Sequence, residues 1–446
     1  MNKIANNKTY DAIIVGSGPG GATVARELAA RNKKVLLLEM GKNAPVKGSK
    51  LQVIKDLGIP GKSFLLTYGG LACVRATAVG GTSLYFYATA FDPPVEMFKK
   101  YGIDISQEVN EAYREIPSSP LKDELIGPRA KRIMESAQSL GLKWNKMNKF
   151  IYQDKCLPDC ELCQMGCPYG AKWTARVYLD EALKNGAELL DGATVNTVLM
   201  DGRQAIGVEY TRKGKTHKVY GENIILAAGG IGSPVLMRKI GVARAGYDYL
   251  YDPFVCTMGY VKDFKAGREL PMAAGLHVPE EGIVMTDLTL PKLLYMGLTA
   301  EVLRFDKVFS HSHILGIMTK AKDDLGGKLT DSGGIRKRLQ KQDKDKMMVG
   351  HNLASKILKK AGAKSIFKSW YIAAHPGGTV RINDLLDSNL KTEFDNLYVC
   401  DNSVMPDPLG LPPTMTIVSL GKRLAKHLAG ARSSRRLEAV SSGRAN

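Results

Sequence analysis

The chain has 446 residues, of which 44% are hydrophobic and 24% charged, and its formal net charge is +19. This length exceeds a single compact core at roughly 100–200 residues per domain, and the composition excludes a disordered, collagen-like or small disulfide-stapled chain. The basic balance implies an acidic partner, which could be nucleic acid, an anionic membrane surface or an acidic protein.

Two kinds of segment are missing from the hydropathy pattern. No stretch reaches the roughly 20 apolar residues that a membrane span needs. Residues 1–10 lack the apolar core of a signal peptide. The sequence therefore predicts a cytoplasmic protein without a transmembrane segment, although peripheral membrane contact stays open.

The chain starts with the pattern of a β-α-β unit. The apolar run 11–15 predicts a buried parallel strand, and a glycine-rich turn follows it. An amphipathic helix is expected to extend to about Ala30. A second apolar run, 35–38, predicts the next strand, which ends at Glu39.

The turn between strand and helix matches the dinucleotide motif GxGxxG through Gly16, Gly18 and Gly21. The first glycine permits the tight turn, the second lets a pyrophosphate approach the backbone, and the third lets helix and strand pack closely. The pyrophosphate would lie at the helix N-terminus, and Glu39 could accept hydrogen bonds from ribose hydroxyls. The motif alone does not separate NAD from FAD, and a glycine-rich loop of packing origin is the alternative.

Further elements are expected along the chain. Helices are predicted over residues 109–113, 130–140 and 176–184, a meander over 194–200, 205–210 and 215–220, and another buried strand over 223–228. Residues 241–369 show no clear periodic pattern, and substrate specificity is expected there. The polar tail, residues 431–446, is predicted to be disordered.

Four of the seven cysteines lie within 12 residues, and a proline follows the last one. Their spacing is similar to that of ferredoxin-type runs, and thiolates are ligands of iron–sulfur clusters and of zinc. A single [4Fe–4S] cluster is the favoured prediction, with structural zinc and with free or disulfide-bonded cysteines as alternatives. The predicted ligands are Cys156, Cys160, Cys163 and Cys167.

Five motifs, in order along the chain, resemble those of the glucose-methanol-choline (GMC) family of FAD-dependent oxidoreductases. They are the glycine-rich turn, Ala78–Ser83, Ala227–Pro234, His375–Thr379, and the closing pair Asn396–Pro406 and Pro412–Thr416. The resemblance covers residues 11 to about 430 but leaves 241–369 without a motif. It implies FAD as the cofactor.

The resemblance implies an α/β fold, in which a Rossmann-like FAD-binding domain is interleaved with an α+β substrate domain. The FAD-binding domain is expected to comprise residues 1–95, 185–240 and 371–430. The substrate domain, which would include the cysteine run, is expected to comprise residues 96–184 and 241–370.

The resemblance also implies the residues of the active site. His375 is the candidate acid/base, because imidazole titrates near neutral pH and can take a hydroxyl proton while hydride goes to the flavin. A purely structural histidine is the alternative. The implied cofactor-binding residues are Gly16, Gly18, Pro19, Gly20, Gly21, Glu39, Met40, Gly80, Gly81, Thr82, Ser83, Val195, Ala228, Gly229, Asp401, Asn402, Pro412 and Thr414.

One position departs from the family pattern. Members usually carry His or Asn directly before the proline of the closing signature, whereas this chain has Pro412. Proline offers no polar side-chain group, so a second polar group over the flavin is missing or comes from elsewhere. This departure leaves room for the reductive direction, in which a C=C or C=O bond is reduced.

Three hypotheses of function follow. The leading one is an FAD and iron–sulfur oxidoreductase that exchanges hydride with an alcohol/carbonyl or C–C/C=C substrate, lipophilic substrates included, and exchanges single electrons with an acidic carrier such as a ferredoxin. The second is an oxygen-using alcohol oxidase with zinc or no metal. The third is a non-catalytic flavin and iron–sulfur relay subunit. Nucleic-acid binding is not expected, because no recognisable nucleic-acid module is present.

Overall fold

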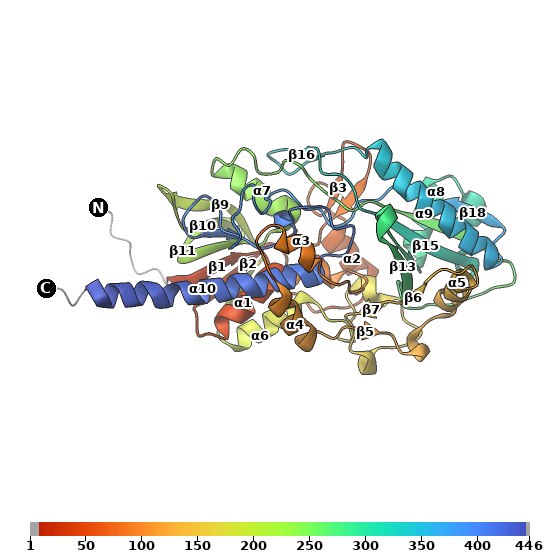
Figure 1. Cartoon of the computed structure of the whole chain (residues 1–446), viewed down its shortest axis with the longest axis horizontal. Helices are drawn as coiled ribbons and strands as arrows, with labels where there is room; N and C mark the ends of the chain where they lie inside the picture. The colour runs from red at the N-terminus through yellow and green to blue at the C-terminus, as the bar shows by residue number, and fades with distance from the viewer. Residues whose placement is uncertain (1–8, 443–446) are drawn as a thin grey trace.

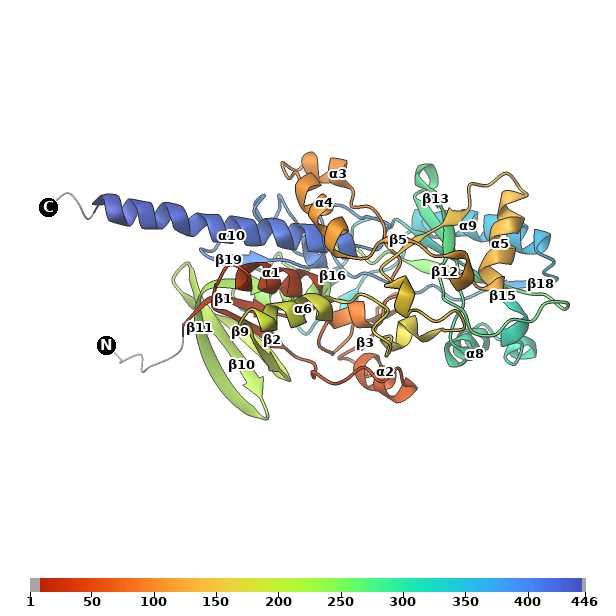
Figure 2. The same ribbon diagram turned by 90° about the horizontal axis from the view of Figure 1, so that it is seen from below.

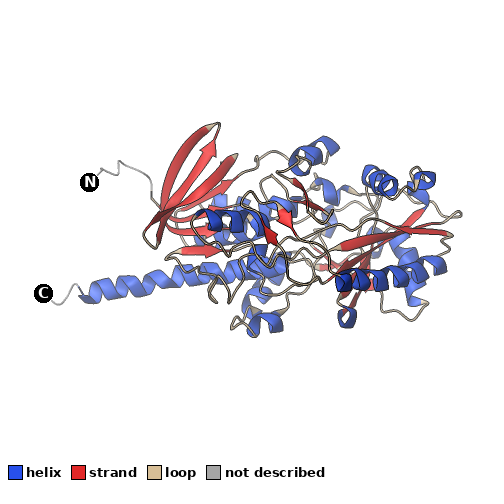
Figure 3. Cartoon of the chain, turned by 90° about the horizontal axis from the view of Figure 1, so that it is seen from above, coloured by secondary structure: helices blue, strands red, loops and turns tan. Residues whose placement is uncertain are grey.

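The structure is a computed structural model that describes residues 9–442, with side chains described for residues 9–430. The molecule is elongated, and its strands gather in two groups toward opposite ends of the long axis (Figure 3). Helices and loops fill the space between the two groups (Figure 1). The predicted α/β class is confirmed by this architecture.

The first sheet has seven strands, in the order β8-β2-β1-β11-β10-β9, with β19 also paired to β11. Its strands are β1 (Tyr10–Val15), β2 (Val35–Glu39), β8 (Glu188–Asp191), β9 (Ala193–Asp201), β10 (Gln204–Arg212), β11 (Lys215–Leu226) and β19 (Leu397–Val399). The pairs among β8, β2, β1, β11 and β19 are parallel, and β9 and β10 extend the sheet in antiparallel pairing. The predicted strands 215–220 and 223–228 are one continuous strand, β11.

The second sheet has six strands, in the order β18-β12-β15-β14-β13-β6. They are β6 (Asn145–Lys146), β12 (Phe254–Tyr260), β13 (Ala274–Val278), β14 (Ile283–Asp287), β15 (Ile314–Ala321) and β18 (Ser365–Lys368). Five of these strands lie in the region where the sequence shows no periodic pattern. The reason is visible in β14 and β15, because every residue of both strands is buried. A strand that is covered on both faces does not alternate between apolar and polar residues.

The helices cover the two sheets. They are α1 (Pro19–Ala29), α2 (Lys50–Leu57), α3 (Val95–Lys99), α4 (Ser106–Glu115), α5 (Pro128–Gln138), α6 (Ala175–Lys184), α7 (Gly229–Lys239), α8 (Lys292–Glu301), α9 (Lys341–Lys360) and α10 (Thr414–Ser442). Three two-stranded ribbons complete the fold: β3 (Phe64–Leu66) with β4 (Ala72–Val74), β5 (Ser119–Pro120) with β7 (Asn148–Lys149), and β16 (Lys328–Leu329) with β17 (Ile335–Arg336).

The helix α10 extends through most of the tail that was predicted to be disordered, and it projects beyond the first sheet in Figure 1. Residues 431–442 include alanine, arginine, leucine and glutamate, which favour the helical conformation once a helix is already formed. Residues 443–446 lie outside the described part of the chain.

The second sheet has an apolar layer on each face. One layer packs against α5 and α9, and close packing there is marked by Gly350, where an added Cβ would lie 2.1 Å from the Thr319 side chain. The opposite layer includes Met258 and Met318 of the sheet and Tyr295 of α8. Because side chains alternate along a strand, Lys320 lies on the same face of β15 as Met318.

Candidate active site

The glycine-rich turn lies at the carboxyl ends of the parallel strands, where open α/β sheets bind their ligands. Gly16 has φ +106°, and an added Cβ would lie 2.3 Å from the Ala227 carbonyl oxygen. Gly20 is equally confined, because its Cβ would lie 1.9 Å from the carbonyl oxygen of Cys400. Gly18 differs from both, since nothing lies within 4 Å of the position of its Cβ. The position beside Gly18 is therefore open, whereas those beside Gly16 and Gly20 are filled by protein.

A second loop lies against this turn. The amide of Gly80 donates to Ser17 Oγ at 3.0 Å, and an added Cβ on Gly81 would lie 3.0 Å from the Gly18 Cα. Ser17 in turn donates to Glu39 Oε2 through its hydroxyl at 2.6 Å and through its amide at 3.0 Å. The two glycine loops and the end of β2 therefore meet at one place, and burial raises the pKa of Glu39.

Asp401, which follows β19, anchors the start of α7. Its carboxylate accepts from the amide of Gly229 at 2.8 Å, the hydroxyl of Ser233 at 2.5 Å and the amide of Ser403 at 2.8 Å. Burial raises the pKa of Asp401. In this structure the carboxylate therefore holds backbone in place, a role that was not predicted from the sequence.

The remaining predicted cofactor residues are spread around the same edge of the first sheet. Asn402 donates through Nδ2 to the carbonyl oxygens of His375 and Pro376, at 2.7 and 3.0 Å. Ser83 Oγ donates to the Gly80 carbonyl at 2.6 Å. The others are placed by their elements: Pro19 and Gly21 in α1, Met40 after β2, Thr82 in the short helix Gly81–Leu84, Val195 on β9, Ala228 before α7, Pro412 before α10 and Thr414 at its start.

His375 lies where the two sheets approach each other. Its carbonyl is held by Asn402, and an added Cβ on Gly230 would lie 2.0 Å from the Pro376 carbonyl oxygen. Its imidazole reaches the second sheet, where Nδ1 lies 2.6 Å from Lys320 Nζ and 3.2 Å from Asp252 Oδ2. The side chains of Lys320 and Asp252 are almost fully buried and lie 3.6 Å apart at their charged atoms.

The charges around His375 shift its titration. Burial and the nearby Lys320 ammonium lower the pKa of His375, and the Asp252 carboxylate opposes the shift. Burial also lowers the pKa of Lys320. A second buried ion pair, Asp323 with Lys337 at 2.5 Å, adjoins this group, because Asp323 Oδ1 accepts from the amide of Asp252 at 3.0 Å.

Lys320 and Asp252 were missed by the sequence analysis. Both lie in the region without a motif, and they approach His375 only because β12 and β15 pair with Phe254 opposite Lys320. One signal was available: a lysine at the end of the apolar run 314–319 is unusual, because buried lysines need partners. Lys320 supplies a polar group beside His375, a kind of group that Pro412 cannot supply.

An apolar surface leads away from this group along β12 and β15. Opposite Met318 lies Cys256, and opposite Gly316 lies Met258. The side chains of this surface are buried, and it ends at a small cavity beneath α8. The cavity is lined by Arg129, Met258, Leu288, Thr289, Leu290, Tyr295, His311, Ile314 and Gly316.

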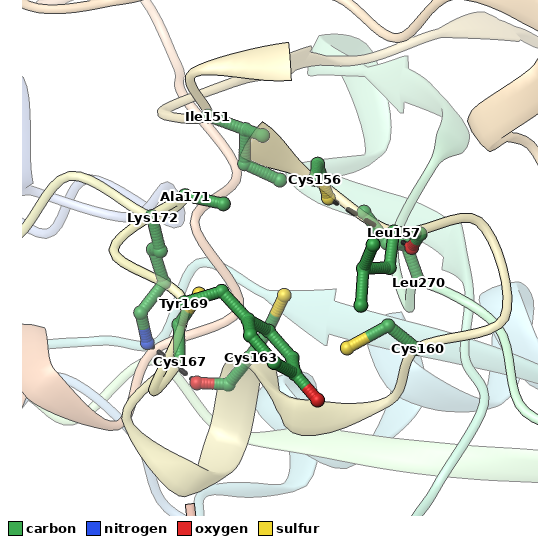
Figure 4. Close-up of a pocket in the computed structure, with 10 residues that line it drawn as sticks. All are labelled: Ile151, Cys156, Leu157, Cys160, Cys163, Cys167, Tyr169, Ala171, Lys172 and Leu270. Carbon is green, nitrogen blue, oxygen red and sulfur yellow. Dashed lines mark hydrogen bonds between the residues drawn. The ribbon is translucent and has the colours of Figure 1, made fainter. Parts of the chain in front are cut away.

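The four clustered cysteines surround a different cavity, which is shown in Figure 4. Cys163 is buried, Cys156 Sγ lies 4.0 Å from the Leu157 carbonyl oxygen, and Cys160 Sγ accepts from the Leu162 amide at 3.4 Å. Burial raises the pKa of the Cys156 thiol to about 12 and also raises those of Cys160 and Cys163. All four cysteines are free of disulfides.

This arrangement does not confirm the predicted metal centre at Cys156, Cys160, Cys163 and Cys167. Among the described residues, no three His, Cys, Asp or Glu side chains are gathered in a way that could hold a metal ion. The thiols of Cys156 and Cys160 instead contact backbone of their own segment.

Two buried lysines accompany the cysteines. Lys172 Nζ donates to the carbonyl oxygens of Leu84, Phe86 and Cys163, at 2.8, 3.0 and 2.5 Å. Burial lowers the pKa values of Lys172 and Lys149 to about 8, and the charge of Cys163 opposes both shifts. Lys172 therefore ties the cysteine segment directly to the end of the loop that contains Gly80 and Gly81.

Comparisons with known proteins agree on one family. The sequence profile of GMC oxidoreductases matches residues 10–256, and a second profile of GMC oxidoreductases matches residues 334–421. The chain is 28% identical over 423 residues to an uncharacterized protein of Methanocaldococcus jannaschii, covering 94% of this chain and 100% of that protein. It is 24% identical over 494 residues to long-chain-alcohol oxidase FAO4B of Arabidopsis thaliana, covering 92% of this chain and 66% of that protein.

The fold is similar to that of a solved structure of formate oxidase from Aspergillus oryzae RIB40. The TM-score is 0.74 at 14% sequence identity, and the match covers 96% of this chain and 100% of that one. Within the described residues, no helix is both long and apolar enough to span a membrane.

Proposed function

Because the chain belongs to the GMC oxidoreductase family and is therefore an FAD-dependent oxidoreductase, we propose that it oxidises an alcohol that carries a long apolar chain. One observation carries the proposal: the buried group of His375, Lys320 and Asp252 adjoins an apolar layer of the second sheet. Asn402 holds the His375 backbone, and Cys400, two residues before Asn402, packs on Gly20 of the glycine-rich turn. The name of the Arabidopsis relative, a long-chain-alcohol oxidase, supports this choice of substrate class and of oxygen as the electron acceptor.

The residues present fit FAD. The space beside Gly18 and the adjoining amides at the start of α1 suit a pyrophosphate, because the N-terminus of a helix attracts anions. Glu39, at the end of β2, is placed to meet a ribose, as in other dinucleotide sites. FAD, when bound, supplies a two-electron acceptor for the hydride of the alcohol.

The contribution of His375 is the movement of a proton at Nε2. When its Nδ1–H donates to Asp252, the unprotonated Nε2 can accept the proton of a substrate hydroxyl. When the Lys320 ammonium donates to Nδ1, the neutral imidazole carries its proton on Nε2 and can donate to a carbonyl oxygen. The first state serves oxidation of an alcohol, and the second serves reduction of a carbonyl.

Mixing the FAD-loaded protein with primary alcohols under anaerobic conditions tests this proposal. We expect the flavin absorbance to bleach with long-chain alcohols, and the second-order rate of bleaching to rise at least tenfold between butanol and dodecanol, because the added methylenes are buried against the apolar face. Admitting oxygen should restore the absorbance and produce hydrogen peroxide. Failure of every alcohol to bleach the flavin, in protein with stoichiometric FAD, would contradict the proposal.

The cysteine cavity favours a second candidate function, in which the chain passes single electrons through a [4Fe–4S] cluster to an external carrier such as a ferredoxin. Four thiols line one cavity, and two buried ammonium groups beside it would compensate the negative charge of thiolate ligands. A four-iron cluster binds each thiolate to a different iron atom. The four sulfur atoms can therefore lie farther apart than they would around a single zinc ion. Lys172 joins this cavity to the loop of Gly80 and Gly81.

Iron, sulfide and zinc analysis of protein purified without oxygen tests the second candidate. We expect about four iron and four sulfide per chain if the cluster is present, together with broad visible absorption that dithionite bleaches. Cys163→Ser should remove the iron. Cys256→Ser is the matched control, because Cys256 is also a buried free thiol but lies on the second sheet. Iron-free protein with plain flavin bands would eliminate the cluster and leave the oxidase.

A further inference from the structure

Large apolar side chains project into solvent from two segments that lie far apart in the sequence. The first segment, residues 47–68, contains α2 and β3, and its exposed side chains are Leu51 (77% exposed), Ile54, Leu66 and Tyr68. The second segment, residues 292–309, contains α8 and a short helix, and its exposed side chains are Leu293, Leu303 (74%), Phe305 and Phe309 (83%). Single exposed apolar residues are ordinary, but a concentration of this kind marks an interaction site.

The two segments project from the same side of the molecule. Figure 2 shows α2 and α8 together along its lower edge, whereas α10, α3 and α4 lie on the opposite side. The buried side of α8 contributes Tyr295 to the cavity beneath it. The exposed Leu293 and the cavity-lining Tyr295 therefore belong to the same helix.

Positively charged side chains accompany the exposed apolar residues of the two segments. The two segments contain seven Lys or Arg residues and three Asp or Glu residues. Lys50, Lys55, Lys62 and Lys292 are exposed, and none of the four forms an ion pair with a carboxylate among the described residues. Each such lysine near an anionic bilayer adds to its attraction.

We infer that residues 47–68 and 292–309 form a docking face for the surface of an anionic phospholipid bilayer, with Leu51, Ile54, Leu303, Phe305 and Phe309 inserted among the lipid chains. A bilayer accepts separate protruding tips without a matching shape, and its headgroups complement the unpaired lysines. The inference does not require the proposed alcohol oxidation.

Co-sedimentation of the FAD-loaded full chain with vesicles tests the docking face. With vesicles of phosphatidylcholine and 30% phosphatidylglycerol we expect binding that weakens at least fivefold when salt is raised from 50 to 500 mM, and at least tenfold weaker binding to phosphatidylcholine alone. The triple variant Leu303→Ser, Phe305→Ser, Phe309→Ser should bind at least tenfold more weakly. Leu51→Ser with Ile54→Ser should also weaken binding. Leu140→Ser is the control, because Leu140 is exposed but lies at the end of α5.

A second measurement reports insertion directly. Two of the three native tryptophans, Trp144 and Trp173, are fully buried, so Phe309→Trp in a Trp370→Phe background places one reporter on the face. Its emission should shift to the blue with anionic vesicles and be quenched by brominated lipid chains. An unshifted emission, or equal loss of binding in Leu140→Ser, would overturn the inference. A dimer in solution that the triple variant converts to monomer would assign the face to self-association instead.

Discussion

Adding one methyl group at Gly18 is expected to weaken FAD binding at least tenfold, and Gly18→Val should weaken it at least a hundredfold. No protein atom lies within 4 Å of the Cβ position, and the backbone of Gly18 has φ −66°, which other residues adopt readily. The added methyl group should therefore meet bound pyrophosphate and no protein atom beyond its chain neighbours. The FAD-free protein should lose at most about 1 kcal/mol, the typical cost of a poorer residue at a helix N-cap.

Gly20→Ala is the matched control for the Gly18 variants. Its Cβ would lie 1.9 Å from the carbonyl oxygen of Cys400, so it should destabilise the FAD-free protein by about 1–3 kcal/mol through overpacking. FAD affinity is measured by titrating FAD-free protein with FAD and following fluorescence quenching, and stability is measured by denaturation of the FAD-free protein. Unchanged FAD affinity in Gly18→Val would mean that the free space does not hold the pyrophosphate.

Removing the imidazole of His375 is expected to slow anaerobic flavin reduction by alcohol about 10²- to 10⁴-fold, the usual contribution of a general base. Asparagine is the preferred replacement, because His375 has φ +46°, a left-handed conformation that asparagine tolerates better than most residues. His375→Asn should keep stoichiometric FAD and an unchanged flavin spectrum. A rate within threefold of the wild type would contradict a proton-accepting role for His375.

The variant Lys320→Met tests the role of His375 in a second way, through the pH dependence of flavin reduction. Burial and the Lys320 charge lower the pKa of His375, so the neutral, proton-accepting imidazole persists to a lower pH than usual. Lys320→Met removes one of the two causes, and the pKa of His375 should therefore rise. The acidic limb of the pH profile of flavin reduction should move to higher pH.

Lys320→Met also leaves the Asp252 carboxylate buried without its cation, which is costly in itself. The double variant Lys320→Met, Asp252→Asn removes both charges and separates this loss of stability from the effect on His375. If the acidic limb stays in place in the single variant, Lys320 acts only on structure.

Local sequence was sufficient to predict those elements and motifs whose residues lie close together in the chain. The run 11–15, the glycines that follow it and Glu39 predict a strand, a tight glycine-rich turn and a second strand, and all three are present. The helices predicted over 109–113, 130–140 and 176–184 are present as α4, α5 and α6. These elements are recognisable because turn chemistry and helical periodicity are local properties.

Contacts between distant residues could not be predicted in this way. The second sheet was missed because its central strands are buried on both faces and carry no alternation. Lys320 and Asp252 reach His375 across 55 and 123 residues of sequence. The sequence predicts that Asp401 meets the cofactor, and the structure adds that its carboxylate holds the backbone at the start of α7.

The sequence by itself determined the dinucleotide-binding unit, the α/β class and the family of this protein, because each rests on short motifs whose geometry is built into a few adjacent residues. Only the tertiary structure decided what surrounds His375, where the four thiols lie relative to the loop that contains Gly80 and Gly81, and which apolar side chains are left exposed. The physical reason is that burial and charge pairing are set by which strands become neighbours. Lys320 illustrates this point, since the role of a lysine in an apolar strand becomes clear only when the fold places Asp252 and His375 beside it.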